Sequence, residues 1–220
     1  MTTRQGPAQR GRRLVAVAAM AAAVLVLAGC AGTEPVRPIE SSAAPSSGMA
    51  PVAAPTADLS GRRAELGIRA CPAAGSGTAV PEGLPSVATP CLDGSGAVDL
   101  STLRGTPMVV NLWATWCGPC RQEAPFLAEV SAGMSGKVEF LGVDVADPDP
   151  SAALEFAGRE GWTYPHVADP DRRFSAGLGV AGLPQTLLVD ADGKIVYRHA
   201  GALTSSDQLR GLVRDHLGVG

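Results

Sequence analysis

The sequence lacks the features that mark several common classes of protein. Apart from four arginines near the N-terminus, its lysine and arginine residues form no cluster, which argues against nucleic-acid binding. Its three histidines lack the spacing of metal ligands, which argues against a metal site; they are His166, His199 and His216. Its acidic turns lack the ligand ladder of a calcium loop and are predicted to be solvated loops and helix caps, at Asp144, Asp147, Asp149, Asp169 and Asp171. The composition, 45% hydrophobic and 18% charged, is that of a globular protein.

An apolar run near the N-terminus, Leu14–Ala28, is shorter than the roughly 20 residues that a membrane-spanning helix needs. It follows the four arginines and ends in small residues, a pattern that predicts an export signal over residues 1–29. The ending Leu-Ala-Gly-Cys resembles the lipobox of bacterial lipoproteins, so Cys30 is the predicted lipidation site. An ordinary signal peptide and an uncleaved anchor are the alternatives. We expect the protein to lie at the extracytoplasmic face of the bacterial cell membrane, held by its lipid anchor.

Two further regions follow the predicted signal. Residues 30–58 are rich in proline, alanine and serine and have no hydrophobic periodicity, which predicts a tether carrying the lipidated cysteine. Residues 59–220 form the predicted folded domain, which is long enough for one well-buried core. Loss of residues 1–29 would leave 14 basic and 21 acidic residues, a formal charge of −7.

Two cysteines, Cys117 and Cys120, stand where an apolar run gives way to a predicted helix. Such a spacing at a helix start is typical of a redox pair, because the positive end of the helix dipole stabilises a thiolate and lowers the pKa of Cys117. Pro119 suits the first helical turn, where its missing N–H would have no partner. Cys120 lies one turn deeper, within reach for a disulfide. No cofactor is expected beyond this redox-active disulfide.

The remaining cysteines are Cys71 and Cys91. In an oxidising compartment we expect them to form a second, structural disulfide that pins the segment before the core. A relay role, in which this pair passes electrons to Cys117 and Cys120, is the alternative.

The pattern of elements predicts an α/β fold with a mixed sheet. Two apolar runs, 108–113 and 138–145, are typical of central strands covered on both faces. Two short strands precede them near 82–90 and 97–100, as an N-terminal hairpin extension. The remaining predicted elements are helices at 151–160 and 172–178, an extended piece at 164–167, a hairpin of strands 187–189 and 195–197, and an amphipathic helix at 204–217.

These elements and two motifs resemble the thioredoxin fold over about residues 81–220. The motifs are Trp116-Cys117-Gly118-Pro119-Cys120 after a buried strand and Gly182-Leu183-Pro184-Gln185-Thr186 before another. The stretch VVNLWATWCGPCRQEAP, together with a helix-strand insertion in the centre of the domain, resembles the membrane-anchored TlpA/ResA-like thiol-disulfide oxidoreductases.

The resemblance implies a role for each residue of the two motifs. Cys117 is the attacking thiolate and Cys120 the more buried, resolving partner. Pro184, preceded by Leu183, matches a cis-proline that faces the disulfide, although a trans bond is the general expectation. Trp116 packs beside the disulfide or simply fills the core. Gly118 and Pro119 complete the motif.

Two further positions separate the chain from thioredoxin itself. Asn111 stands where thioredoxins carry a buried aspartate that accepts a proton, which asparagine cannot do. Glu123 matches an acidic residue near the active site of the TlpA/ResA-like group, and helical spacing brings it to the face of Cys120. Burial there raises its pKa and lets it exchange a proton with the Cys120 thiol. A surface glutamate in the first helical turn is the alternative.

The sequence therefore predicts an enzyme that exchanges thiols and disulfides with protein substrates through a mixed disulfide at Cys117. The resemblance favours a reductant of the cytochrome-c-maturation type, supplied with electrons by a membrane partner. An oxidising disulfide donor for exported proteins is the alternative within this class, and a copper-binding accessory lipoprotein is the alternative from another class. A monomer is expected.

Overall fold

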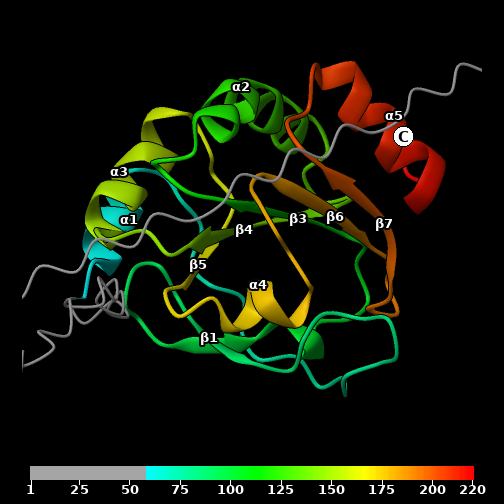
Figure 1. Cartoon of the computed structure of the whole chain (residues 1–220), viewed down its shortest axis with the longest axis horizontal. Coiled ribbons are helices and arrows are strands. Elements are labelled where there is room, and N and C mark those ends of the chain that lie inside the picture. Colours follow the sequence, from blue (N-terminus) through cyan, green and yellow to red (C-terminus); the bar gives the residue numbers. More distant parts are fainter. Residues whose placement is uncertain (1–57) are drawn as a thin grey trace, which may run out of the picture. The chain divides into compact units, whose positions relative to one another are not determined.

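The computed structural model describes residues 58–220 (Figure 1). The predicted export signal, the lipidation site Cys30 and nearly all of the tether lie outside the described residues. The central sheet has five strands: β3 (Met108–Trp113), β4 (Glu139–Val145), β5 (His166–Asp169), β6 (Gln185–Val189) and β7 (Ile195–Ala200). Their order is β5-β4-β3-β6-β7. The strands β3, β4 and β5 are parallel, while β6 runs antiparallel to β3 and β7 antiparallel to β6. The predicted mixed sheet is confirmed.

Helices cover both faces of this sheet. They are α1 (Ser60–Glu65), α2 (Gly118–Gly133), α3 (Pro150–Arg159), α4 (Arg173–Gly177) and α5 (Ser206–Leu217), with a 3₁₀ turn at Leu100–Thr102. Figure 1 shows α2, α3 and α5 over one face and α4 over the other. The strands β1 (Ala88–Pro90) and β2 (Ala97–Asp99) pair antiparallel on the α4 side, as the predicted N-terminal hairpin extension. The segment α3–β5 is the predicted helix-strand insertion.

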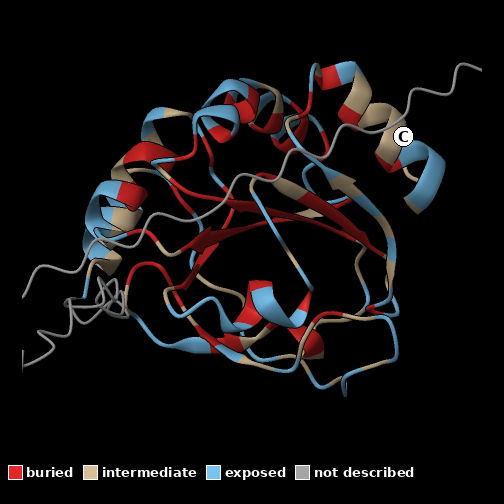
Figure 2. Cartoon of the chain, viewed as in Figure 1, coloured by how far each residue is buried: buried red, intermediate tan, exposed pale blue. Residues whose placement is uncertain are grey.

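Alternation along β3 divides the core into two layers. Val109 and Trp113 pack on the side of α2, α3 and α5. Val110 and Leu112 pack on the side of α4 and the hairpin. Because successive side chains of a strand point to opposite faces, a strand covered on both sides must be apolar at nearly every position. Figure 2 shows the central strands buried along their length.

The one polar position in β3 is Asn111, which by this alternation faces α2 with Val109 and Trp113. It is paired with Thr186 of β6 in the antiparallel register. The strand then ends four residues before Cys117, and α2 begins immediately after that cysteine. The side-chain amide of Asn111 therefore lies buried beneath the first turns of α2.

Several expectations need correction in detail. The short helix α1 has no buried residue and left no pattern in the sequence. Asp144 is not in a solvated loop: it lies on β4, is 2% exposed, and has its pKa raised by burial and by the neighbouring Asp147. Asp147 is also buried, at 5% exposed, and accepts from the Thr115 N–H instead of lying in a solvated loop. The cap prediction holds at two of the other positions. Asp149 accepts from backbone N–H groups at the start of α3, and Asp169 does the same at the start of α4.

A cluster of aromatic rings fills the core between the sheet and α3. Trp113, Phe156, Trp162, Tyr164 and His166 pack with ring centroids 4.8 to 5.6 Å apart. Burial lowers the pKa of His166 to about 3, so the imidazole is neutral at ordinary pH. Of the three histidines scattered along the sequence, His166 is therefore a core residue.

Candidate active site

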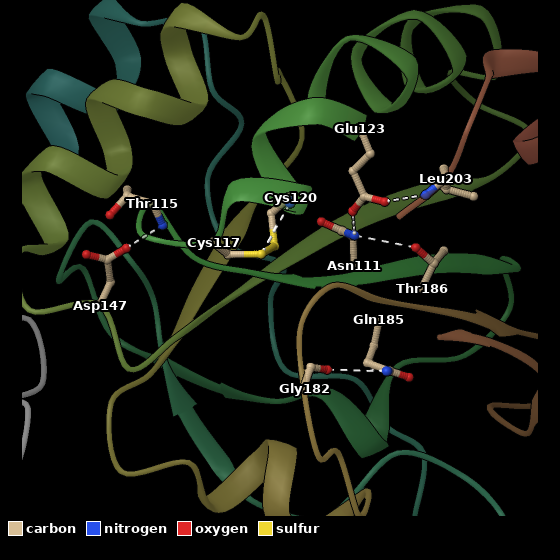
Figure 3. The surroundings of a disulfide bond; sticks show 10 residues. All are labelled: Asn111, Thr115, Cys117, Cys120, Glu123, Asp147, Gly182, Gln185, Thr186 and Leu203. Carbon is tan, nitrogen blue, oxygen red and sulfur yellow. Dashed lines mark hydrogen bonds between the residues drawn. A yellow bond between two sulfur atoms is a disulfide. The ribbon is translucent and has the colours of Figure 1, made fainter. Parts of the chain in front are cut away.

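The predicted disulfide between Cys117 and Cys120 is present at the start of α2 (Figure 3). Cys117 is the N-cap residue, and its Sγ accepts a hydrogen bond from the backbone N–H of Cys120 at 3.2 Å. Cys117 is 4% exposed and Cys120 is fully buried. The two cysteines therefore differ as expected, with Cys120 deeper in the protein.

This cap geometry favours a negative charge on Cys117 in the reduced protein. The unpaired N–H groups and the dipole of the first helical turn point toward its sulfur. The intervening Gly118 and Pro119 are exposed, and Pro119 takes a first-turn position in which no N–H is required. The N-terminus of α2 thus supplies a positive potential at Cys117 and a solvent-exposed surface next to it.

Glu123 lies behind Cys120, fully buried, and accepts hydrogen bonds from two different parts of the chain. Its Oε1 accepts from Asn111 Nδ2 at 2.9 Å, and its Oε2 accepts from the backbone N–H of Leu203 at 2.8 Å (Figure 3). Burial raises the pKa of Glu123 to about 7, against the lowering effect of these two hydrogen bonds. The carboxyl group therefore changes protonation state near neutral pH. Its complete burial excludes the alternative of a surface glutamate.

Asn111 has unused hydrogen-bonding capacity beside this carboxyl group. Its Nδ2 also donates to Thr186 Oγ1 at 3.4 Å, while its Oδ1 is buried without a partner among the described residues. An amide offers a donor and an acceptor within one side chain. Asn111 can therefore partner a carboxylate through its NH₂ group, or a protonated carboxyl through its oxygen after rotation of the amide.

The loop between β3 and α2 is held by the loop that follows β4. The backbone N–H of Thr115 donates to Asp147 Oδ2 at 2.7 Å, and Trp116 Nε1 donates to the carbonyl oxygen of Ala146 at 3.3 Å. Trp116 is 52% exposed, so it does not fill the core. It stands at the surface next to Cys117. Sequence reasoning missed Asp147, because nothing in the pattern ties that turn to the cysteine loop.

The second motif reaches the site as a loop before β6. The peptide bond between Leu183 and Pro184 is cis, as the resemblance implies. The carbonyl oxygen of Gly182 accepts from Gln185 Nε2 at 3.3 Å, and Pro184 is buried. Figure 3 shows Gly182 and Gln185 across from the disulfide. Sequence reasoning also missed Thr186 and the Leu203 backbone; Thr186 stands inside the quoted motif, whereas Leu203 is brought in only by the fold.

Comparison with known proteins places this site in a family. Residues 76–212 match the Redoxin family. The chain belongs to the redoxin family. It is 39% identical over 125 residues to a thiol:disulfide interchange protein DsbE homolog of Paracoccus denitrificans, covering 56% of this chain and 67% of that protein. It is 33% identical over 118 residues to the thiol-disulfide oxidoreductase ResA of Bacillus thuringiensis, covering 53% and 67%.

Solved structures agree with this assignment. The structure of MTB dsbF matches with a TM-score of 0.55 and 32% identity, covering 62% of this chain and 98% of that one. This redoxin is therefore a thiol-disulfide oxidoreductase of the thioredoxin superfamily, as the sequence predicted.

The second cysteine pair of this redoxin lies away from the helix that carries the first. Cys71 and Cys91 are joined by a disulfide, and Cys91 forms an isolated bridge with Val167 of β5. The predicted pairing is therefore confirmed, and it ties the segment after α1 to the sheet. Within residues 58–220, no group of three or more His, Cys, Asp or Glu side chains is placed to hold a metal ion. No helix in the same range has the length and apolar character needed to cross a membrane.

Proposed function

We propose that this redoxin reduces disulfides of extracytoplasmic proteins through Cys117, as in cytochrome c maturation. The observation that carries the proposal is the pairing of two features at one helix start. Cys117 caps α2 where its thiolate is stabilised, and Glu123 lies buried behind Cys120 with a pKa of about 7. Thiol-disulfide exchange needs an attacking thiolate and an acceptor for the proton of the second thiol. The reductive direction is proposed from the similarity to the DsbE and ResA proteins.

The reaction proceeds in two thiol-disulfide exchanges. The Cys117 thiolate attacks one sulfur of the substrate disulfide, forming a mixed disulfide and releasing the other sulfur as a thiolate. The Cys120 thiol then loses its proton and attacks Cys117 Sγ, which closes the Cys117–Cys120 disulfide and releases the second substrate thiol. Two electrons pass from the protein to the substrate.

Glu123 serves the second exchange. Its carboxylate accepts the Cys120 proton, directly or through one water, at the moment when Cys120 must become a thiolate. Asn111 supports both protonation states of Glu123, since its unpartnered oxygen can accept from the carboxyl O–H that forms. The resemblance implies that Pro184 faces the disulfide, and Trp116 precedes Cys117 at the surface, so in this proposal both bound the space through which the substrate approaches Cys117.

The setting proposed for this chemistry is the extracytoplasmic face of the membrane. It is supported by the predicted export signal and by the lipobox-like ending at Cys30. In this setting a membrane electron-transfer partner returns the disulfide to the dithiol, and the protein acts as a lipid-anchored monomer.

The direction of electron flow is tested by the reduction potential of the Cys117–Cys120 pair, measured in the full chain by equilibration with dithiothreitol or glutathione. A Cys71→Ala/Cys91→Ala variant separates the contribution of the other disulfide. A potential near that of thioredoxin, roughly −270 mV, supports the reductant; one near roughly −120 mV identifies an oxidising disulfide donor instead.

The chemistry itself is tested by reduction of insulin disulfides. We expect Cys117→Ser to abolish activity and Cys120→Ser to accumulate a mixed disulfide with the substrate, since the resolving thiol is then missing. Full activity of Cys117→Ser would overturn the proposal.

A further inference from the structure

A cavity of about 200 Å³ opens beside the active-site loops, and it contains one charge. Its walls come from Trp116, which precedes Cys117, from Leu183, which precedes the cis-proline, and from Ser175 of α4. Apolar residues at the end of β4 and after α4 complete them; these are Val145, Val180 and Ala181. Arg172, at the N-cap of α4, is the only charged residue lining it. The surface beside Trp116 is therefore mostly apolar, with one hydroxyl group and a single positive group.

Arg172 has no counter-charge within the described part of the chain. Its guanidinium makes neither an ion pair nor a hydrogen bond with any of residues 58–220. The adjacent Asp171 is exposed and makes no ion pair with Arg172 within residues 58–220, and two nearby buried acids are already engaged. Both carboxylate oxygens of Asp169 accept from the backbone N–H groups of Phe174 and Ser175, and Asp147 accepts from Thr115. The Arg172 guanidinium is thus available to pair with a negatively charged group of another molecule.

The backbone of Arg172 adds a second observation. It is left-handed, with φ 57° and ψ 23°, a conformation that glycine or asparagine adopts at lower cost than arginine. The backbone conformation therefore gives no reason for an arginine at this position. What the arginine side chain adds is a guanidinium group at the wall of the cavity.

We propose that the cavity binds the substrate segment next to its reactive cysteine, and that Arg172 selects substrates carrying an aspartate or glutamate in that segment. The proposal rests on the proposed function, because the segment arrives there when Cys117 forms the mixed disulfide. Guanidinium groups pair well with carboxylates, and the apolar walls around Arg172 reduce competition from water. The formal charge of the whole chain is −3, so this attraction is local and opposes the overall field.

The test uses peptides that contain one disulfide and differ only by glutamate or glutamine at one of the positions one to three residues on either side of the cysteine. The rate constant for their reduction by the full-length reduced protein is measured for each pair. At one or two positions we expect the glutamate peptide to react about three- to fivefold faster at low salt, the size of effect typical of a partly exposed ion pair. The preference should fall in 0.5 M salt.

Three variants separate this role from a general charge effect. Arg172→Gly removes the side chain and relieves the left-handed backbone, so the variant should fold, and it should react equally with both peptides. Arg172→Glu should reverse the preference. Arg173→Gln removes the neighbouring exposed charge, which does not line this cavity, and should keep the preference.

The outcomes distinguish this inference from the function on which it rests. Equal rates for every peptide pair with the wild-type protein would overturn the role of Arg172 and leave the oxidoreductase activity established. Loss of preference in Arg173→Gln as large as in Arg172→Gly would also overturn it. Failure of the wild-type protein to reduce any peptide would overturn the proposed function itself, and this inference with it.

Discussion

Glu123 joins three parts of the chain at a single buried carboxyl group. It projects from α2 and accepts hydrogen bonds from Asn111 of β3 and from the backbone of Leu203, just before α5. Two donors would normally hold the pKa of a carboxyl group low, yet burial outweighs them and raises it to about 7. The residue is therefore kept ready to take up or release a proton at the pH at which thiols and disulfides exchange.

This raised pKa predicts how stability depends on pH. Between its ordinary pKa of 4.5 and about 7, Glu123 is protonated in the folded protein and ionised in the unfolded chain. Its contribution to the free energy of unfolding therefore falls as the pH rises through this window, by about 3 kcal/mol in total. Glu123→Gln cannot ionise, so its stability relative to the wild-type protein should increase by about that amount from pH 4.5 to pH 8, measured by urea unfolding.

A difference between variants is needed because His166 acts in the opposite direction. Its pKa of about 3 in the folded protein makes stability rise with pH between about 3 and 6.5, and this slope is common to both proteins. Glu160→Gln, at the half-exposed C-cap of α3, is the matched control and should show a difference from wild type that does not change with pH. A difference for Glu123→Gln that is equally flat would contradict the prediction.

At the scale of elements, the segment that follows α1 is held by a disulfide and a few hydrogen bonds, with little apolar packing. The disulfide between Cys71 and Cys91 closes a sequence separation of 20 residues. Within residues 72–87 the only buried residue is Leu84. Without the disulfide, little hydrophobic burial would fix this stretch against the sheet.

Removing this disulfide should therefore lower the stability of the domain but leave its thiol-disulfide exchange activity unchanged. The Cys71→Ala/Cys91→Ala variant should lose about 3 kcal/mol of unfolding free energy, because the unfolded chain regains the entropy of the opened loop. Urea unfolding with Cys117 and Cys120 kept oxidised measures this. Insulin reduction at equal folded concentration should be unchanged. A folded variant that no longer reduces insulin would instead indicate the relay role.

At the scale of the whole domain, burial is concentrated on the inner strands. Every residue of β3 is buried, and β3 lies between β4 and β6. The strand β7 is at an edge and alternates between half-buried and exposed residues, and α1 has no buried residue. We therefore expect the highest local stability in the central strands beneath α2, and lower local stability in β7 and α1.

Hydrogen exchange should follow this distribution. Amides of β3 should exchange only by global unfolding, whereas those of α1 should exchange through local opening, at least a hundredfold faster, because little apolar surface is exposed when that helix opens. The measurement is native-state amide exchange on the oxidised protein followed by mass spectrometry or NMR. Equal protection in α1 and β3 would show that the domain opens only as one unit.

Local patterns were sufficient to predict much of this protein. The apolar run of β3, the cap and spacing of the two cysteines, and the turn between β6 and β7 each depend on neighbours in the chain. Because such features obey periods of two or three to four residues, their positions were predicted to within two residues or so. Helical spacing placed Glu123 on the face of Cys120, whereas the preference for a buried over a surface glutamate came from the resemblance.

Only the tertiary structure decided which distant groups meet. Leu203 is 80 residues from Glu123, Asp147 is 32 residues from Thr115, and Arg172 reaches the wall beside Trp116 through the turn before α4. No periodic pattern in the sequence predicts these contacts, because they depend on how the strands are ordered and how the loops pack. The sequence by itself determined the reacting cysteines, their helix and the fold. The packing of the sheet determined the buried carboxyl's pKa and the charge beside the cysteine, because burial and proximity are properties of the folded chain.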